Sequence, residues 1–230
     1  MERKINFSIG EYYHIYNRGN DKRDIFLDNS DYLRFLVLLY ICNNNKAVHI
    51  SNFLNQGGTL IELFGVNKEK KLVDIGAYCL MKNHFHLLIR ERNENGITDF
   101  MRKLSTAYSM YFNKKKERTG KLFEGVFKAV HIDNDKYLKY LFSYIHLNPL
   151  EFYMPNWKEG RINDFSKARK YLSIYKYSSY IDYIFDKNRI ESVILNKEAF
   201  PEYFIDFNEF DNFIDNWLKY SSYQGATLIT

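Results

Sequence analysis

Apolar residues recur at two different spacings along the first 150 residues, and these spacings predict the secondary structure. Strict alternation indicates strands, whereas apolar positions three and four residues apart indicate amphipathic helices. A hairpin is predicted around Lys82-Asn83, and the last helix ends before Pro149 because the residue preceding proline avoids helical geometry. Strands are predicted over residues 11–17, 72–80, 84–90 and 126–132, and helices over residues 32–40, 96–116 and the stretch from 133–135 to 148.

The order of these elements defines a fold class. Strand, helix, strand, strand, helix, strand and helix form a split β-α-β arrangement, which predicts an α+β fold with an antiparallel sheet and helices mainly on one face. Residues 47–72 fit neither spacing clearly. The aromatic and acidic residues 200–217 predict a helical C-terminal extension that packs on the domain, with an acidic flap competing with DNA as the alternative.

Composition narrows the class of protein. The chain has 230 residues, of which 46% are hydrophobic, including 20 Tyr and 19 Phe, so a large packed core is expected. Neither a membrane-spanning run nor a signal peptide is visible in the sequence. Cys42 and Cys79 fit no metal-binding spacing and are expected to be buried thiols. These features predict a cytoplasmic protein without a membrane partner.

Charge is distributed unevenly along the chain. The net charge is +5, yet residues 196–230 hold two basic and six acidic residues, which leaves a net +9 on residues 1–195. Residues 101–128 alone hold eight basic and two acidic residues. This concentration indicates a polyanionic partner, although a solvated basic helix face would have the same composition.

His84-Phe85-His86 is the strongest chemical signal in the sequence. Two histidines one residue apart on a strand share a face, about 7 Å apart along it, whereas the apolar residue between them faces the core. Such a pair can hold one metal ion and leave coordination positions open, as a catalytic metal requires. The alternative is that two of the chain's six histidines are close by chance.

The last predicted helix carries candidate partners for this pair. Tyr144 and Asn148 are four residues apart, so they lie on one side of the helix, at the flank of its apolar face. Tyr137 lies on the same flank and competes with Tyr144 as a functional residue. His146 falls on nearly the opposite flank, which excludes it as a ligand beside Asn148.

Several segments, in one consistent order over roughly residues 12–184, resemble the single-tyrosine HUH transposases of insertion sequences, and among them most closely the REP-associated tyrosine transposases. HUH denotes histidine, hydrophobic residue, histidine. The matching segments are Tyr13-His-Ile-Tyr-Asn-Arg-Gly19, Ile25-Phe-Leu-Asp28, Met81-Lys-Asn-His-Phe-His-Leu-Leu-Ile89, Met101-Arg-Lys-Leu104, Tyr111-Phe-Asn113, Gly120-Lys-Leu-Phe-Glu-Gly-Val-Phe-Lys128, Tyr144-Ile-His-Leu-Asn-Pro149 and, more weakly, Tyr177-Ser-Ser-Tyr180.

The resemblance implies a ferredoxin-like sheet, a catalytic domain over residues 1–184 and an extension over 185–230. It implies that Tyr144 is the nucleophile and that His84, His86 and Asn148 bind a divalent metal, Mg or Mn; the ligands alone would also allow zinc. Two segments depart from the family pattern. Val126 replaces a common arginine, and residues 150–153 read Leu-Glu-Phe-Tyr instead of Val-Arg-Ala-Gly.

The implied function is nicking and strand transfer of single-stranded DNA next to a hairpin, through a covalent 5′-phosphotyrosine, by a monomer or homodimer. Alternatives are a non-catalytic binding protein for hairpin or single-stranded DNA on the same fold and a metallohydrolase that does not use Tyr144. Basic side chains could contact phosphates or only solvent, and aromatic ones could stack on bases or pack in the core. The candidate DNA contacts are Tyr16, Arg18, Lys82, Arg102, Tyr111, Lys114, Lys115, Arg118, Phe123 and Lys128.

Overall fold

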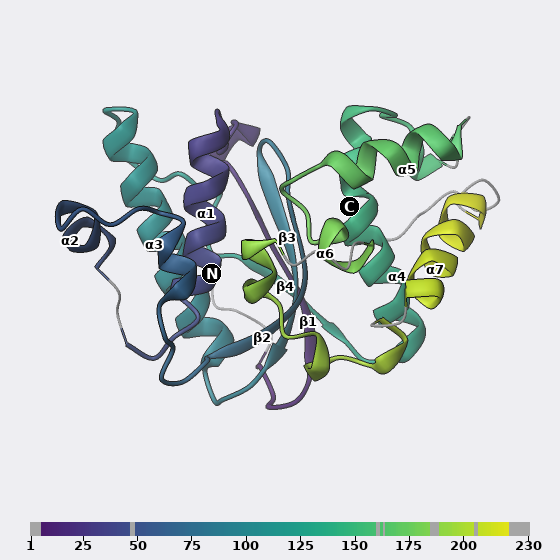
Figure 1. The fold of residues 1–230 in the computed structure, drawn as a ribbon, viewed down its shortest axis with the longest axis horizontal. Coiled ribbons are helices and arrows are strands. Elements are labelled where there is room, and N and C mark those ends of the chain that lie inside the picture. Colours follow the sequence, from purple (N-terminus) through teal and green to yellow (C-terminus); the bar gives the residue numbers. More distant parts are fainter. Residues whose placement is uncertain are drawn as a thin grey trace.

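A four-stranded antiparallel sheet forms the middle layer of the molecule (Figure 1). Its strands lie in the order β2-β3-β1-β4, and all neighbours are antiparallel, which confirms the predicted sheet. The strands are β1 (Tyr12–Arg18), β2 (Val73–Leu80), β3 (His84–Glu91) and β4 (Lys128–Ile132). The computed structural model describes residues 6–46, 49–159, 162, 164–184, 189–204 and 207–220.

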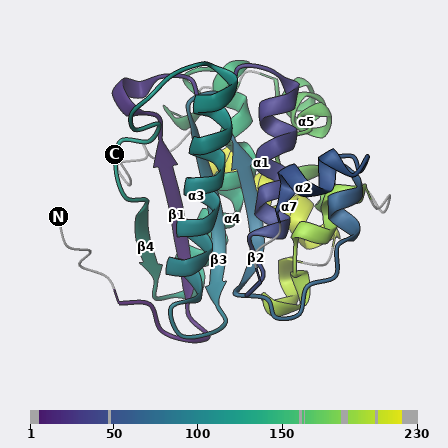
Figure 2. The same ribbon diagram turned by 90° about the vertical axis from the view of Figure 1, so that its left-hand side faces the viewer.

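Helices cover both faces of this sheet. The helices α1 (Asn29–Ile41) and α3 (Gly96–Lys115) pack side by side on one face, and α4 (Asp135–Leu147) lies against β2 and β3 on the other (Figures 1 and 2). The expectation that the helices lie mainly on one face is therefore corrected. The physical reason is that every residue of β2 is buried, so both sides of the strand need an apolar cover.

Capping side chains determine where two of the three helices on the sheet, α1 and α4, begin. Asp28 precedes α1, and its carboxylate accepts hydrogen bonds from the backbone N–H groups of Ser30 and Asp31. Asn134 precedes α4 and accepts one from the N–H of Tyr137 at 2.8 Å. Such side chains satisfy donors that the first helical turn leaves free. The α-helix α4 ends at Leu147, before Pro149, as predicted, but Asn148 keeps helical backbone angles (φ −51°, ψ −38°) and begins the 3₁₀ helix Asn148–Phe152.

Four further α-helices, together with short 3₁₀ helices, lie in the described part of the chain. The four α-helices are α2 (Ile50–Asn55), α5 (Phe165–Ile174), α6 (Tyr180–Ile184) and α7 (Phe207–Tyr220). The helix α7 packs against α4 and α6 and buries Phe210 and Ile214 completely, while Asp211 and Asp215 form ion pairs with Arg169. This part of the acidic segment therefore packs on the domain. None of the described helices is long and apolar enough to cross a membrane.

Candidate active site

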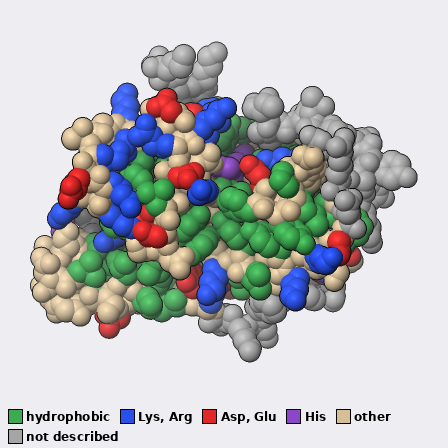
Figure 3. Space-filling model, turned by 90° about the horizontal axis from the view of Figure 1, so that it is seen from above, with side chains coloured by type: hydrophobic (Ala, Val, Ile, Leu, Met, Phe, Trp, Pro, Cys, Tyr) green, Lys and Arg blue, Asp and Glu red, His purple; other side chains and the backbone are tan. Residues whose placement is uncertain are grey.

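The two histidines of β3 face α4. Because side chains alternate along a strand, His84 and His86 share the face toward α4 while Phe85 points to α1, where its ring lies 5.0 Å from that of Phe35. The imidazole centroids of His84 and His86 are 5.0 Å apart and nearly perpendicular. Histidine side chains are visible in a hollow of the surface in Figure 3. His84 is partly exposed, whereas His86 is 6% exposed.

The helix α4 places Tyr144 against this pair. Leu141 and Ile145 are completely buried, which fixes the rotation of the helix about its axis. Tyr144, on the flank of this apolar face, has its ring centroid 5.5 Å from that of His86 in an edge-to-face arrangement. Its side chain keeps 8% of its surface exposed. The candidate nucleophile and the histidine pair thus meet, although they come from separate elements.

Asn148 lies one turn after Tyr144, at the end of α4. Its side-chain amide donates a hydrogen bond to the backbone carbonyl of Tyr144 at 2.7 Å, and the residue is completely buried. The other atom of this side chain, Oδ1, is buried and accepts no hydrogen bond from any described residue. A buried acceptor without a partner is costly, which marks this oxygen as available to a ligand.

In each residue of the histidine pair, Nδ1 has a hydrogen-bonding neighbour, which leaves Nε2 available to bind a metal. Nδ1 of His84 lies 2.6 Å from Oδ1 of Asn83, and Nδ1 of His86 lies 2.9 Å from Nε2 of His14. Burial lowers the pKa of His84 to about 4 and that of His86 well below its usual value. Both rings are therefore neutral at pH 7, and a neutral imidazole is the form that binds metals.

These atoms form a donor set that fits a divalent cation. Two imidazole nitrogens and one amide oxygen would occupy three coordination positions and leave the others to phosphate or water. Across the described ranges, no group of three His, Cys, Asp or Glu side chains is placed to hold a metal. The candidate site therefore depends on the amide of Asn148 as much as on the histidines.

We expect the metal-free protein to lose stability in mild acid, because three histidines are buried, His84 is partly buried, and all four are neutral. Burial lowers the pKa of His14 and His146 to about 3 and that of His84 to about 4, from an ordinary 6.5, and His86 shifts in the same direction. Above pH 6.5 neither state takes up a proton. Below it only the unfolded state does, so the free energy of unfolding falls by ~1.4 kcal/mol per pH unit for each such histidine.

Urea unfolding of metal-free protein between pH 7.5 and 5 measures this effect. Unfolding midpoints that stay constant across this range would contradict the burial of these rings. Substitution of the exposed His131 is the control for removal of an imidazole that is not buried.

His14 is a site residue that the sequence reasoning missed. It lies on β1, beside β3, is completely buried, and contacts His86 through the 2.9 Å hydrogen bond. The sequence held a partial signal for it, because His14 and Tyr16 are two residues apart on one strand and therefore share a face. The pairing of Tyr16 with His86 shows that this is the face of the histidine pair. His146, excluded from the metal site on helix geometry, is buried elsewhere and bonds to Ser179 through Nε2 at 2.8 Å.

The segment after α4 adds two further residues that the sequence did not indicate. Trp157 is completely buried, with its ring 6.1 Å from that of Tyr144. The ammonium of Lys158 lies 5.5 Å from the centroid of the Tyr144 ring and 3.3 Å from the carboxylate of Glu151. A positive charge therefore lies beside the candidate nucleophile, a few residues after the stretch 150–153 in which the sequence departs from the family pattern.

Three of the predicted DNA contacts gather around the histidine pair. Tyr16 pairs with His86 across β1 and β3, with ring centroids 5.9 Å apart, and Arg18 pairs with His84 in the same ladder. Lys128, on the neighbouring β4, places its ammonium 5.8 Å from the centroid of the Tyr16 ring. These three predicted DNA contacts therefore lie close to the candidate metal ligands.

The other predicted contacts lie farther from the pair or are already engaged. Phe123 is 5% exposed and packs edge-on against Phe85, so the structure places it in the core. Arg118 donates to Oδ1 of Asn113, and Lys114 is exposed. Lys and Arg side chains gather on one side of the face seen in Figure 3. Besides Lys115, three of the predicted cations form ion pairs: Arg18 with Glu124 (2.8 Å), Lys82 with Asp24 (3.0 Å) and Arg102 with Asp99 (3.0 Å).

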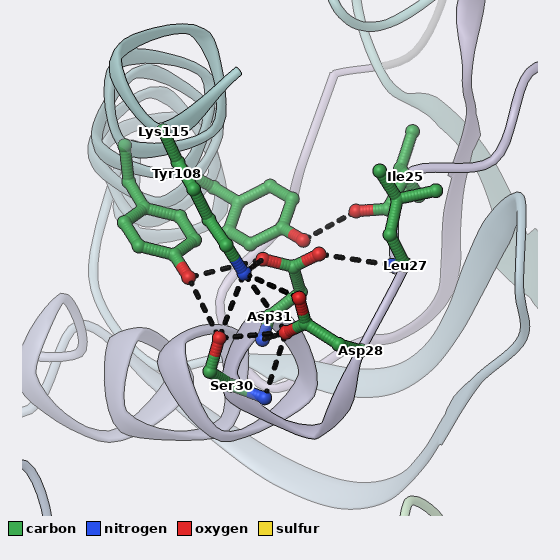
Figure 4. Close-up of polar contacts among 8 residues, drawn as sticks. Ile25, Leu27, Asp28, Ser30, Asp31, Tyr108 and Lys115 are labelled. Atoms are coloured by element: carbon green, nitrogen blue, oxygen red, sulfur yellow. Dashed lines mark hydrogen bonds and ion pairs between the residues drawn. The ribbon is translucent and has the colours of Figure 1, made fainter.

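Lys115, another predicted DNA contact, is tied to the start of α1 (Figure 4). Its ammonium donates to both carboxylate oxygens of Asp28, to Ser30 and to the fully buried Asp31, at 2.7–2.8 Å. Tyr111 donates to the same oxygen of Asp31 at 3.0 Å. Burial alone would lower the pKa of Lys115, but the bonds to Asp28 and Asp31 outweigh it and raise the pKa above its usual value. The geometry gives Lys115 a structural role.

Replacing Lys115 with methionine should lower the free energy of unfolding by about 2 kcal/mol, because the buried carboxylate of Asp31 loses its counter-ion. Urea unfolding at pH 7 measures the change. Lys114→Met, at the exposed neighbouring position, is the matched control and should change stability by less than ~0.5 kcal/mol. Equal stability of the two variants would mean that Lys115 does not neutralise Asp31.

Comparison with known proteins shows the family to which the chain belongs. Residues 10–148, more than half of the chain, match the family model described as "Transposase IS200 like". A solved structure of a REP-associated tyrosine transposase bound to a REP hairpin is similar, with a TM-score of 0.49, 12% identity, and coverage of 83% of this chain and 90% of that one. No curated protein sequence matches. The chain belongs to the IS200-like transposase family, whose members are enzymes of DNA transposition.

Proposed function

We propose that this transposase cleaves and rejoins single-stranded DNA through a covalent bond between DNA and Tyr144. The observation that carries the proposal is the edge-to-face contact of the Tyr144 and His86 rings, which puts a hydroxyl-bearing side chain beside a pair of neutral imidazoles. Within the family established above, this combination favours phosphoryl transfer over simple metal-dependent hydrolysis.

The reaction balances without an energy source. The oxygen of Tyr144 forms a bond to the phosphorus of a phosphodiester, and the bond from phosphorus to the 3′ oxygen breaks. The tyrosine proton is released to solvent, and the departing oxygen takes up a proton to become a free 3′ hydroxyl. The DNA 5′ phosphate stays on Tyr144, so attack by another 3′ hydroxyl can reverse the step and join a different strand.

The surrounding residues hold Tyr144 for this attack. A tyrosine hydroxyl has an ordinary pKa near 10, so at pH 7 it is a weak nucleophile and benefits from fixed geometry. Trp157 and Tyr140 pack on its ring at 6.1 and 6.2 Å. Asn148 donates to its backbone carbonyl. Lys158 supplies a positive charge 5.5 Å from the centroid of the ring, and this charge would attract a phosphate.

His84, His86 and Asn148 would hold the divalent cation. When bound, it would polarise the scissile phosphate and stabilise the charge that develops in the transition state. Resemblance to the family favours Mg²⁺ or Mn²⁺. Of these, two imidazole ligands favour Mn²⁺, because Mg²⁺ prefers an all-oxygen environment.

The proposed substrate is single-stranded DNA next to a hairpin. The similar REP-associated transposase was solved with a REP hairpin, and we extend that class of substrate to this chain. In support, Tyr16 and Lys128 flank the histidine pair on the sheet, and Lys158 lies beside Tyr144. An aromatic ring with a cation beside it can bind unpaired nucleotides by stacking and charge.

A denaturing gel with doubly labelled DNA tests the proposal. Hairpin oligonucleotides with a single-stranded flank are incubated with the full chain and Mn²⁺, and each strand end carries a different dye. We expect the label on the 3′ side of the nick to migrate with the protein and the other label to appear as a shorter free strand. Binding without cleavage in Mg²⁺, Mn²⁺ or Zn²⁺ would support the non-catalytic alternative, and cleavage with no protein-linked label would support hydrolysis.

A further inference from the structure

His14 contacts a candidate metal ligand, and the proposed chemistry does not yet use it. It is completely buried on β1. Its ring lies beside those of Tyr16 and His86, with centroids 4.8 and 5.1 Å away and planes within 30° of parallel, and the Tyr16 and His86 rings are themselves 5.9 Å apart. In this cluster of three rings, Nε2 of His14 lies 2.9 Å from Nδ1 of His86.

The two nitrogens in this bond cannot both carry a proton when both rings are neutral. If Nε2 of His86 binds a metal through its lone pair, the proton of His86 must reside on Nδ1. Nδ1 of His86 then donates, and Nε2 of His14 accepts. The opposite arrangement, with His14 donating, would leave the His86 proton on Nε2 and block that nitrogen as a ligand.

The second nitrogen of His14 shows that packing alone does not explain this residue. Nδ1 of His14 is buried and has no hydrogen-bond partner among the described residues. A buried polar atom without a partner destabilises a fold, and a phenyl ring would fill a similar volume without that cost. The feature that a phenyl ring cannot reproduce is the acceptor at 2.9 Å from His86.

We propose that His14 is a positioning residue that holds His86 in the tautomer and orientation needed to bind the divalent metal through Nε2. This inference rests on the proposed function, because it assumes that His86 is a ligand. It extends that function to β1, the strand that His14 shares with Tyr16. Residues that accept a hydrogen bond from a metal-binding histidine commonly tune metal affinity in this way.

The tautomer is measurable without metal or DNA. In ¹⁵N-labelled metal-free protein, long-range nitrogen–proton NMR spectra show which nitrogen of each neutral imidazole carries the proton, and His86→Gln identifies the His86 signals by their loss. We expect the proton of His86 on Nδ1. A proton on Nε2 of His86 in the wild-type protein would overturn the proposal, whatever the behaviour of any variant.

Metal affinity gives an independent test with matched variants. His14→Phe removes the acceptor, whereas His14→Gln keeps an acceptor oxygen near the position of Nε2. We expect His14→Phe to bind Mn²⁺ roughly 10- to 100-fold more weakly than the wild type and His14→Gln to recover most of the loss. Electron paramagnetic resonance of free Mn²⁺ measures both, and His131→Phe, on the exposed face of β4, is the control.

The outcomes separate this inference from the proposed function. Wild-type Mn²⁺ affinity in folded His14→Phe would overturn the role of His14, while leaving the metal site intact. Wild-type affinity in His84→Ala and His86→Ala would instead refute the metal site itself, and with it the assumption on which this inference rests. Circular dichroism of each variant establishes that it is folded, and the tautomer of the wild-type protein decides the proposal if His14→Phe does not fold.

Discussion

Tyr144→Phe is expected to abolish formation of the DNA–protein adduct and to reduce nicking by at least ~1,000-fold. The substitution removes only the nucleophilic oxygen, and loss of a nucleophile removes the covalent pathway rather than weakening it. Because the ring stays, its contacts with His86 and Trp157 are kept. Stability and DNA binding should therefore change little.

Two neighbouring tyrosines make this prediction specific. Tyr137 and Tyr140 follow one another along the same flank of α4, and their rings stack in sequence toward Tyr144 with centroids 6.2 Å apart. Tyr144 is the member of this row whose ring contacts those of His86 and His14. Tyr137→Phe and Tyr140→Phe should keep the adduct.

Single-turnover assays with labelled hairpin DNA, resolved on denaturing gels, measure both the adduct and the nick. An adduct that persists in Tyr144→Phe and disappears in Tyr137→Phe would move the nucleophile to Tyr137. Nicking at the wild-type rate without any adduct would replace strand transfer with hydrolysis.

His86→Ala is expected to produce the second large effect, a loss of metal-dependent nicking of roughly 100-fold or more. A bound metal contributes several kcal/mol to the stabilisation of transition-state charge, and each 1.36 kcal/mol corresponds to a factor of ten in rate. The substitution also breaks the bond to His14. Chelation of divalent metal in the wild-type protein should have an effect of similar size.

Titration of the nicking rate with Mn²⁺ distinguishes a weakened metal site from a damaged fold. For a weakened site, higher Mn²⁺ should recover part of the rate, and thermal unfolding of the metal-free variant should stay close to that of the wild type. His131→Ala provides the control for removal of an imidazole from the same sheet. Full activity of His86→Ala, or of wild-type protein in excess chelator, would contradict a metal-dependent mechanism.

The secondary structure was predictable because its causes are local. The alternation in residues 84–90, the caps Asp28 and Asn134, and Pro149 act within a few residues, and the corresponding elements β3, α1 and α4 are present. The facing of His84 and His86, with Phe85 opposite, follows from the same alternation. For α4, helical periodicity also placed Tyr144 and Asn148 together and His146 apart from them.

The distribution of the helices over two faces was not predictable in this way. A strand buried on both sides lacks the polar alternation that marks a solvent-exposed face, so the sequence of β2 does not show which helix covers which side. Gly76 illustrates the dependence on distant contacts. It leaves room for the ring of Phe200, while its carbonyl accepts a hydrogen bond from Tyr183.

For individual side chains, the sequence shows which residue types could contact DNA, and the tertiary contacts decide which of them are free to do so. Lys115 and Phe123 have residue types suited to DNA, yet tertiary contacts engage Lys115 with Asp31 and bury Phe123 against Phe85. Conversely, Lys158 had no signal in the sequence, and its place beside Tyr144 results from the path of the chain after α4.

The sequence by itself therefore determined the elements, the shared face of His84 and His86, and the pairing of Tyr144 with Asn148, because strand and helix periods are properties of consecutive residues. Only the tertiary structure brings the histidine pair together with Tyr144 and Asn148. It brought α4 onto β3, set His14 of β1 within hydrogen-bonding distance of His86, and placed Lys158 next to Tyr144. Contacts between residues far apart in the chain depend on how the core packs, and that information is spread over the whole sequence.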